Sequence, residues 1–324
     1  MRVVMFMASQ YGLECYRAVK EIKDVVICGI LTTPAHFELK YEKNKTKEMD
    51  NTIYHDVIAE SETKNIPVYV TDKMNNEKSV SVIRNWKPDL IVVSGWYHII
   101  KEEILGIPPK GIIGLHTSLL PQYRGGAPLV WQMINGEKKA GITLFYMDHG
   151  TDTGDVIGQR EVAIEEEDDI GTLYQKVGKK GIELLQNYIP QIAENVAPRK
   201  QQPDVCGGGA EQYRVYPQRK AEDGRIDWSK KSKDIYNFVR AQTRPYPGAF
   251  STYDGDVVSI WKCRSVEIES RDDSAGIIVD IVEKDGERHP VISTGERGYG
   301  MEIIDYSFRS GDEKIQMEKG KKLM

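Results

Sequence analysis

The chain has 324 residues, of which 40% are apolar and 29% charged, and its formal net charge is −5. This is the composition of an ordinary globular protein of about two domains, and the negative charge excludes an overall basic field for nucleic acid, although a local basic patch stays possible. No apolar run approaches the roughly 18 residues of a membrane span. The four scattered cysteines form no C-x-x-C pair, which argues against a zinc site or a disulfide framework and favours a soluble, cytoplasmic protein.

The first third of the chain alternates apolar strands with helical patterns. Continuous apolar runs at residues 3–7, 25–31 and 90–94 predict buried parallel strands, with a shorter strand at 68–70. Helices are expected between them, near residues 53–62 and 80–86. The pattern is typical of a Rossmann-like, doubly wound α/β sheet covered on both faces. Neither a G-x-G-x-x-G nor a G-x-x-x-x-G-K-[ST] motif is present, so neither dinucleotide nor P-loop chemistry is indicated.

A polar insertion follows the second predicted strand, at residues 33–50. Its four lysines are balanced by four acidic residues. A loop that grips phosphates is expected to carry an excess of Arg and Lys. We therefore predict an exposed, flexible loop.

A change of character near residue 200 divides the chain. A helix is predicted from Asp168 or Asp169 to about residue 195, and residues 199–213 then lack periodicity. From about residue 215, a short helix at 233–241 and several short strands suggest a small β-barrel. The predicted domains are a catalytic domain at 1–200, a linker at 201–214 and a β-barrel-like, OB-like domain at 215–324.

Two strand ends carry the residues that point to chemistry. His116 leaves an apolar run and enters a loop rich in Ser, Pro and Gly, and Asp152 lies in an acidic, Gly-rich turn after the apolar run at residues 141–147. Ligands of open α/β sheets bind at the carboxyl ends of the strands, and a carboxylate near a histidine raises the histidine pKa. His116 and Asp152 are therefore a candidate acid–base pair.

The segments LHTSLLPQYRGGAPL and DHGTDTGD resemble the family of 10-formyltetrahydrofolate-dependent formyltransferases. The segments QRKAEDGRIDW and RPYPGAF resemble that family's C-terminal barrel domain, so the likeness covers nearly the whole chain. It implies that His116 is the catalytic histidine and that Asp152 raises its pKa. It implies folate contacts, largely through backbone groups near the pterin, by His98, Ile99, Ile100, Ser118, Leu119, Leu120, Pro121, Asp148, His149, Gly150 and Thr151. Substrate contacts are expected from Ser9, Gln10, Tyr11, Tyr123 and Arg124.

The implied reaction is attack of a neutral amine on the formyl carbonyl of 10-formyltetrahydrofolate. Protonated His116 would stabilise the oxyanion, and proton transfer would release tetrahydrofolate, with no metal required. The family's Asn two positions before the histidine is Gly114 here. Loss of one oxyanion donor typically costs about 10²–10³ in rate. Thr117, Ser118, a substrate group or a water could substitute, or the enzyme could be slow or inactive; retained activity is the favoured reading.

Two amine acceptors compete: a nucleotide-linked 4-amino sugar, and the amino group of methionyl-tRNA. The charge-balanced insertion, the negative net charge and the likeness of residues 94–100 and 121–137 to the UDP-4-amino-4-deoxy-L-arabinose formyltransferase domain favour the sugar. Gly126 replaces an arginine of that domain, and the final EKGKKLM resembles the tRNA enzyme. A third reading is a degenerate folate- or nucleotide-binding module without catalysis. The partners expected are therefore a nucleotide aminosugar before tRNA, and no membrane, with a homodimer left open.

Overall fold

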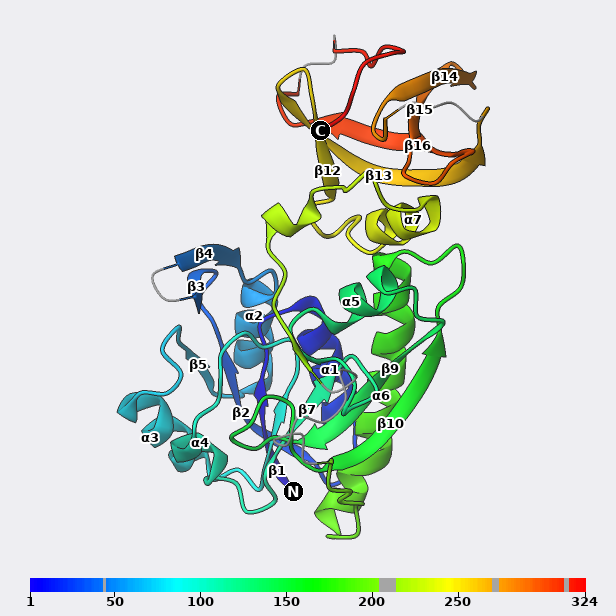
Figure 1. Cartoon of the computed structure of the whole chain (residues 1–324). Helices are drawn as coiled ribbons and strands as arrows, with labels where there is room; N and C mark the ends of the chain where they lie inside the picture. The colour runs from blue at the N-terminus through cyan, green and yellow to red at the C-terminus, as the bar shows by residue number, and fades with distance from the viewer. Residues whose placement is uncertain (43–44, 204–213, 270–273, 312–314) are drawn as a thin grey trace. The chain divides into compact units, whose positions relative to one another are not determined.

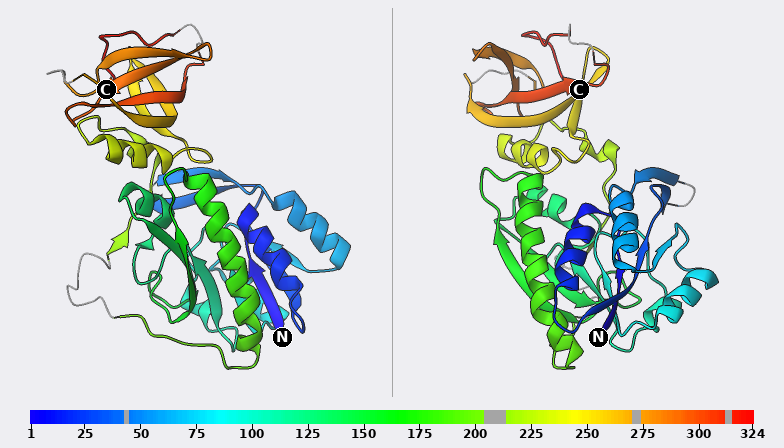
Figure 2. Two further views of the ribbon diagram at one scale, coloured as in Figure 1. Left: turned by 90° about the vertical axis from the view of Figure 1, so that its right-hand side faces the viewer. Right: turned by 180° about the vertical axis from the view of Figure 1, so that it is seen from behind.

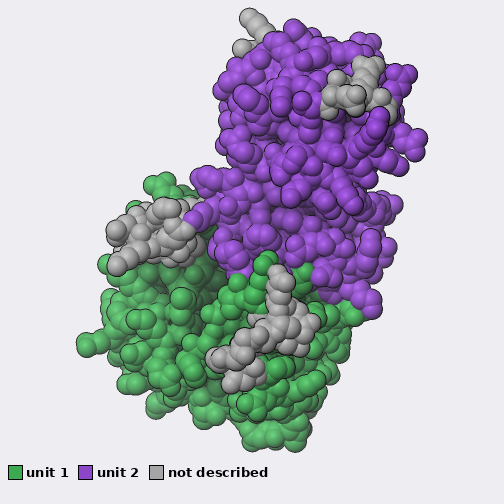
Figure 3. Space-filling model, viewed as in Figure 1, with its two compact units in different colours: residues 1–124, 141–161, 177–215 green, residues 125–140, 162–176, 216–324 purple. Residues whose placement is uncertain are grey.

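The computed structural model describes residues 1–42, 45–203, 214–269, 274–311 and 315–324, and these form two compact units (Figure 3). The first unit comprises residues 1–124, 141–161 and 177–215, and the second comprises residues 125–140, 162–176 and 216–324. The predicted domain boundaries stay a prediction. Most of the predicted linker, residues 204–213, lies outside the described residues.

A seven-stranded sheet with the order β10-β9-β7-β6-β1-β2-β5 organises the first unit (Figure 1). Its strands are β1 (Arg2–Phe6), β2 (Val26–Thr32), β5 (Val68–Val70), β6 (Leu90–Val93), β7 (Ile112–His116), β9 (Lys139–Tyr146) and β10 (Val156–Ala163). β5, β2, β1, β6 and β7 pair with one another in parallel. β9 runs antiparallel to β7, so the sheet is mixed. The expected α/β fold is confirmed.

Helices cover this sheet and complete its core. They are α1 (Gln10–Lys20), α2 (Tyr54–Lys64), α3 (Glu77–Trp86), α4 (Glu102–Leu105) and the long α6 (Ile170–Ala193), which contains Pro190. α6 lies beside α1 (Figure 2), and the Tyr11 hydroxyl donates to the Gly178 carbonyl at 3.4 Å. A Cβ at Gly181 would lie 2.0 Å from the Tyr11 oxygen, so only glycine permits this close packing.

The prediction of a flexible loop for residues 33–50 is wrong. The segment contains two antiparallel strands, β3 (His36–Glu42) and β4 (Lys45–Asp50), which pair Phe37 with Met49. Apolar residues alternate with charged ones in the sequence HFELKYE, which is the strand period, and Phe37 is buried. The charges obscured that alternation.

The second unit is built on a five-stranded antiparallel sheet with the order β12-β13-β16-β15-β14. Its strands are β12 (Ala249–Tyr253), β13 (Asp256–Glu267), β14 (Ile278–Lys284), β15 (Glu287–Ser293) and β16 (Tyr299–Phe308). Figure 2 shows that the sheet is strongly curved. α7 (Ser232–Arg240) packs against its core through Ile235 and Val239. The prediction of a small C-terminal β-barrel-like domain is confirmed as an antiparallel β domain.

The remaining elements are short. They are α5 (Pro128–Ile134), the 3₁₀ turn η2 (Ala221–Gly224), and the two-residue strands β8 (Arg124–Gly125) and β11 (Val215–Tyr216). Across the described part of the chain, no helix combines the length and apolar character that crossing a membrane requires.

Candidate active site

His116 is the last residue of β7, and both of its ring nitrogens face oxygen atoms. Nε2 donates to the backbone carbonyl of Tyr123 at 2.8 Å. Nδ1 lies 3.5 Å from Oδ2 of Asp152. The residue is only 8% exposed. The structure thus brings together the two residues predicted as the acid–base pair and fixes the imidazole from both sides.

The turn that carries Asp152 joins β9 to β10 and is tightly built. Asp148 Oδ1 accepts hydrogen bonds from the Gly150 amide at 3.0 Å and the Thr153 hydroxyl at 2.7 Å. A Cβ at Gly154 would lie 1.7 Å from the Tyr146 carbonyl oxygen, so this position requires glycine. Asp152 itself has a left-handed φ of 54°. His149, Gly150 and Thr151, all predicted folate contacts, are exposed at the tip of this turn.

The loop after His116 is held against β9 by polar contacts. Thr143 on β9 donates through Oγ1 to the Ser118 carbonyl at 2.6 Å and accepts from the Leu120 amide at 3.1 Å. The Ser118 hydroxyl donates to the Gln122 carbonyl at 2.6 Å. Its proton is therefore engaged within the loop, which weakens Ser118 as a replacement oxyanion donor. Of the other predicted folate contacts, Leu120 is buried, and Leu119 and Pro121 are half-buried.

The loop after β6 is rich in aromatic rings. Trp96 packs edge-on against His98 at 5.4 Å between ring centroids, and Phe37 lies 6.0 Å from His98. Trp96 Nε1 and His98 Nε2 are buried and hydrogen-bond to no group among the described residues. Burial lowers the pKa of His98, against the opposite effect of Asp72, so its ring is neutral near pH 7. Ile100 is buried in the core, whereas Ile99 is 83% exposed.

The predicted substrate contacts occupy two different environments. Ser9 caps α1 by accepting from the Gly12 amide at 3.3 Å, and Gln10 is exposed beside it. Tyr123 has a left-handed φ of 55° and offers its carbonyl to His116. Arg124 is 1% exposed, so its guanidinium is buried inside the first unit.

Gln202 is a site residue that the sequence did not reveal. Its Oε1 accepts from Arg124 Nη2 at 2.7 Å and Nε at 3.2 Å. Its Nε2 donates to the carbonyls of Asp152 at 2.9 Å and Gly154 at 2.7 Å. The residue lies in the stretch predicted as a linker, where no local pattern distinguishes it from its neighbour Gln201.

Gly114 lies two residues before His116 on β7, and its surroundings are apolar. A Cβ built there would lie 3.3 Å from Met147 Sδ and 3.4 Å from Phe145 Cε1. Met147 also packs against the buried residues Leu120 and Phe145. The side chain of Met147 therefore occupies the space into which a larger residue at position 114 would extend.

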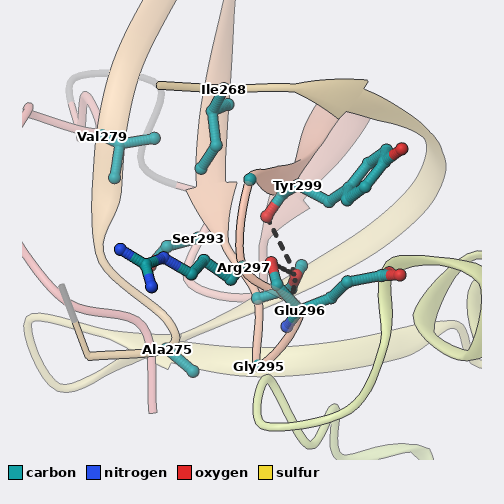
Figure 4. A pocket seen from close by; sticks show the side chains of 10 residues that line it. Ile268, Ala275, Val279, Ser293, Gly295, Glu296, Arg297 and Tyr299 are labelled. Carbon is teal, nitrogen blue, oxygen red and sulfur yellow. Dashed lines mark hydrogen bonds between the residues drawn. The ribbon is translucent and has the colours of Figure 1, made fainter. Parts of the chain in front are cut away.

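A cavity of about 320 Å³ lies in the second unit, far along the sequence from these residues (Figure 4). The Ser293 hydroxyl donates to the Ser274 carbonyl, the Thr294 hydroxyl donates to the Tyr299 carbonyl, and Glu296 accepts from Ser232. These polar groups are satisfied within the protein. No predicted site residue lines this cavity, and no group of three or more potential metal-binding side chains occurs among the described residues.

Comparisons with known proteins agree with the fold. Residues 2–189 match the formyl transferase family, and residues 219–306 match its C-terminal domain. The chain is 35% identical to a methionyl-tRNA formyltransferase of Clostridioides difficile (strain 630) over 286 residues, which are 88% of this chain and 87% of that relative.

Two solved structures share the fold at low sequence identity. A methionyl-tRNA formyltransferase from Clostridium thermocellum has a TM-score of 0.55 and 18% identity, covering 92% of this chain and 100% of that one. An N-formyltransferase from Helicobacter canadensis, in complex with folinic acid and dTDP-3-aminofucose, has a TM-score of 0.59 and 17% identity, covering 93% and 98%. At such identities the likeness shows the fold alone. The sequence matches show more: this chain belongs to the formyl transferase family and is an enzyme of one-carbon group transfer.

Proposed function

We propose that this protein transfers the formyl group of 10-formyltetrahydrofolate to the amino group of methionyl-tRNA. The choice of methionyl-tRNA as the acceptor rests on the 35% identity to a methionyl-tRNA formyltransferase over 88% of this chain and 87% of that relative. This reverses the preference for a sugar that the net charge and the insertion suggested.

The aromatic loop after β6 fits the pterin of the folate. A flat heteroaromatic ring has stacking faces and edge acceptors. This loop supplies rings at Trp96 and His98, and Phe37 of β3 packs beside His98. It also supplies the buried indole N–H of Trp96, which costs free energy for as long as it has no acceptor. We propose that the folate provides that acceptor as well as the formyl carbon.

His116 is the proposed catalytic residue. In its protonated form it would stabilise the negative charge that develops on the formyl oxygen when the amine attacks, and its imidazole is a group able to transfer protons near neutral pH. Asp152 Oδ2, 3.5 Å from Nδ1, orients the ring. The hydrogen bond from Nε2 to the Tyr123 carbonyl keeps the ring in one plane until the substrates are bound.

One face of the second unit is suited to an RNA backbone. Phe250 on β12 and Trp261 on β13 lie on the same side of the sheet, because Phe250 pairs with Ser259, two residues from Trp261. Exposed arginines cover both rings: Arg225 and Arg309 each lie 5.1 Å from the centre of Phe250, and Arg244 lies 4.3 Å from that of Trp261. Such arginines can contact phosphates while they stay stacked.

A nucleotide-linked aminosugar is the second candidate acceptor, favoured by the charge balance of the insertion at residues 33–50. One contact argues against UDP-4-amino-4-deoxy-L-arabinose as this sugar. A Cβ at Gly126 would lie 2.5 Å from the Cα of Gln218, so the arginine found there in the arabinose enzyme has no space.

A tetrahydrofolate-release assay with methionyl-tRNA and with a panel of nucleotide aminosugars separates the candidates. We expect turnover with methionyl-tRNA, and an Arg225→Ala/Arg309→Ala variant should raise the KM for tRNA about tenfold with kcat unchanged. An exposed lysine on β14, Lys284→Ala, is the control. Turnover only with a sugar would overturn the tRNA proposal, and tetrahydrofolate binding without turnover would support a degenerate module.

A further inference from the structure

We propose that Gln202 and Arg124 are positioning residues that hold the catalytic turn, and that Gln202 acts on the reaction through Asp152. This inference rests on the proposed role of the His116–Asp152 pair. Gln202 lies near the end of the first unit. Its side chain contacts the backbone carbonyl of Asp152 but neither the Asp152 carboxylate nor the His116 ring.

All hydrogen-bonding capacity of the Gln202 amide is used. Its two N–H groups donate to the carbonyls of Asp152 at 2.9 Å and Gly154 at 2.7 Å, and its oxygen accepts twice from Arg124. The two carbonyls can only accept and the guanidinium can only donate, so these partners also determine which amide atom is nitrogen and which is oxygen. The residue is 7% exposed, so water competes little for these bonds. Gln202 is a four-point clamp.

The clamp acts on a backbone that needs support. Asp152 has a φ of 54°, a left-handed conformation that costs a non-glycine residue free energy. Gln202 binds the carbonyl of this residue and of the second residue after it. It therefore holds the part of the turn from which the Asp152 carboxylate reaches His116.

Arg124 connects the clamp back to the other side of the histidine ring. It follows directly on Tyr123, whose carbonyl accepts from His116 Nε2. The contacts form a closed ring: His116 to Tyr123, along the chain to Arg124, to Gln202, to Asp152, and back to His116 Nδ1. The two supports of the imidazole are thus fixed relative to each other by one amide and one guanidinium.

Gln202→Glu tests the clamp with little change in volume. The carboxylate keeps an acceptor for Arg124, but it loses both donors and sets an oxygen against the two turn carbonyls. We expect kcat to fall about 10²-fold, the loss typical of a small misplacement, with KM within about threefold. Gln202→Met, which removes the polar contacts without adding charge, should give a loss of similar size. The matched control is Gln201→Glu, the same change at the exposed neighbouring residue, with kcat unchanged.

A double-mutant cycle separates positioning from general stability. In an Asp152→Asn background, Gln202→Glu should lower kcat by less than about twofold, because its effect passes through the Asp152 carboxylate. The same large loss in both backgrounds would overturn the proposal.

NMR of protein labelled with ¹⁵N-histidine gives a readout independent of turnover, the ring N–H signal of His116. This signal is assigned by its absence in His116→Gln. We expect slow exchange with water in the native protein and in Gln201→Glu, and faster exchange in Gln202→Glu. Unchanged exchange in Gln202→Glu would overturn the clamp. Faster exchange in a protein that forms no formylated product would support the clamp and count against the proposed function alone.

Discussion

Nδ1 of His116, the last residue of β7, and Oδ2 of Asp152, in the turn between β9 and β10, lie 3.5 Å apart. Replacing either residue should remove proton transfer or charge stabilisation, a contribution of about 10²–10⁴ in rate. We expect Asp152→Asn and His116→Ala each to lower kcat in this range with no change in the melting temperature beyond a few degrees. His55→Ala, an exposed histidine on α2, is the control. A His116→Ala variant with native kcat would exclude the assignment.

The indole N–H of Trp96 should matter more for folate binding than for stability. Trp96→Phe keeps a ring but removes the buried donor, so the loss of packing and the relief of an unsatisfied group offset each other. We expect a free energy of unfolding within about 1 kcal/mol of the native value and an affinity for tetrahydrofolate about tenfold weaker, which is the value of one hydrogen bond.

Trp86→Phe provides the contrast for Trp96. Trp86 covers Gly29 of β2, where a Cβ would lie 2.4 Å from its ring. Its truncation should lower stability by about 1–3 kcal/mol and leave folate affinity unchanged. Calorimetric titration with tetrahydrofolate and urea unfolding measure both quantities. Equal folate affinity in the two variants would count against the pterin site.

Position 114 should resist an asparagine while Met147 is present. The added side chain would meet Met147 and Phe145, and such overpacking typically costs about 1–3 kcal/mol. We expect Gly114→Asn to lower the melting temperature, and Gly114→Asn/Met147→Ala to recover most of it. The double variant should also exceed Met147→Ala in kcat by at least about tenfold, because it regains an oxyanion donor. No gain in single-turnover rate would show that another group already fills this role.

A buried carboxylate, Glu302, should make the second unit sensitive to acid. Glu302 is 2% exposed and accepts from Arg264 Nε at 2.8 Å and His289 Nδ1 at 3.0 Å. Burial alone would raise the pKa of Glu302, but these hydrogen bonds outweigh it and hold the pKa below its usual value. A carboxyl of this kind stabilises the fold above its unfolded pKa of about 4.3, and the stability is lost as the pH falls toward the folded pKa.

Glu302→Gln should therefore cost about 1–3 kcal/mol at pH 7, the usual cost of losing hydrogen bonds to a charged group, because Arg264 is half-exposed. The difference from the native protein should shrink below about pH 4, where the carboxyl becomes protonated. Urea unfolding between pH 3 and 7, followed by tryptophan fluorescence, measures this. Glu283→Gln, on the exposed part of β14, should show no such dependence. A penalty for Glu302→Gln that is constant with pH would rule out the charge effect.

The sequence predicted that His116 and Asp152 lie together because the signals for this are local. An apolar run that stops at a polar residue marks the end of a buried strand, and His116 and Asp152 both follow such runs. The helices α2, α3 and α7 were predicted to within a few residues because helical spacing of apolar residues is also a local signal. The β3–β4 hairpin was missed because charges alternate with Phe37, Leu39 and Tyr41, and net charge was given more weight than the period of two.

Other features depend on contacts that no local pattern records. Arg124 stands in a polar, glycine-rich loop and was expected to face the substrate, yet Gln202 covers its guanidinium. Gln202 lies in a stretch without periodicity, and its partners are 48 or more residues away along the chain. Net charge also does not report local arrangement: Arg225 and Arg309 lie over Phe250, and Arg244 lies over Trp261.

The clamp on the catalytic turn has a consequence for exchanging parts between relatives. The match to the family's catalytic domain ends at residue 189, thirteen residues before Gln202. A chimera joined at that boundary would pair the Asp152 turn of one parent with the connecting segment of another. Such a hybrid would fold its sheet correctly and still lose activity, unless the donor segment also supplies a glutamine at the position of Gln202.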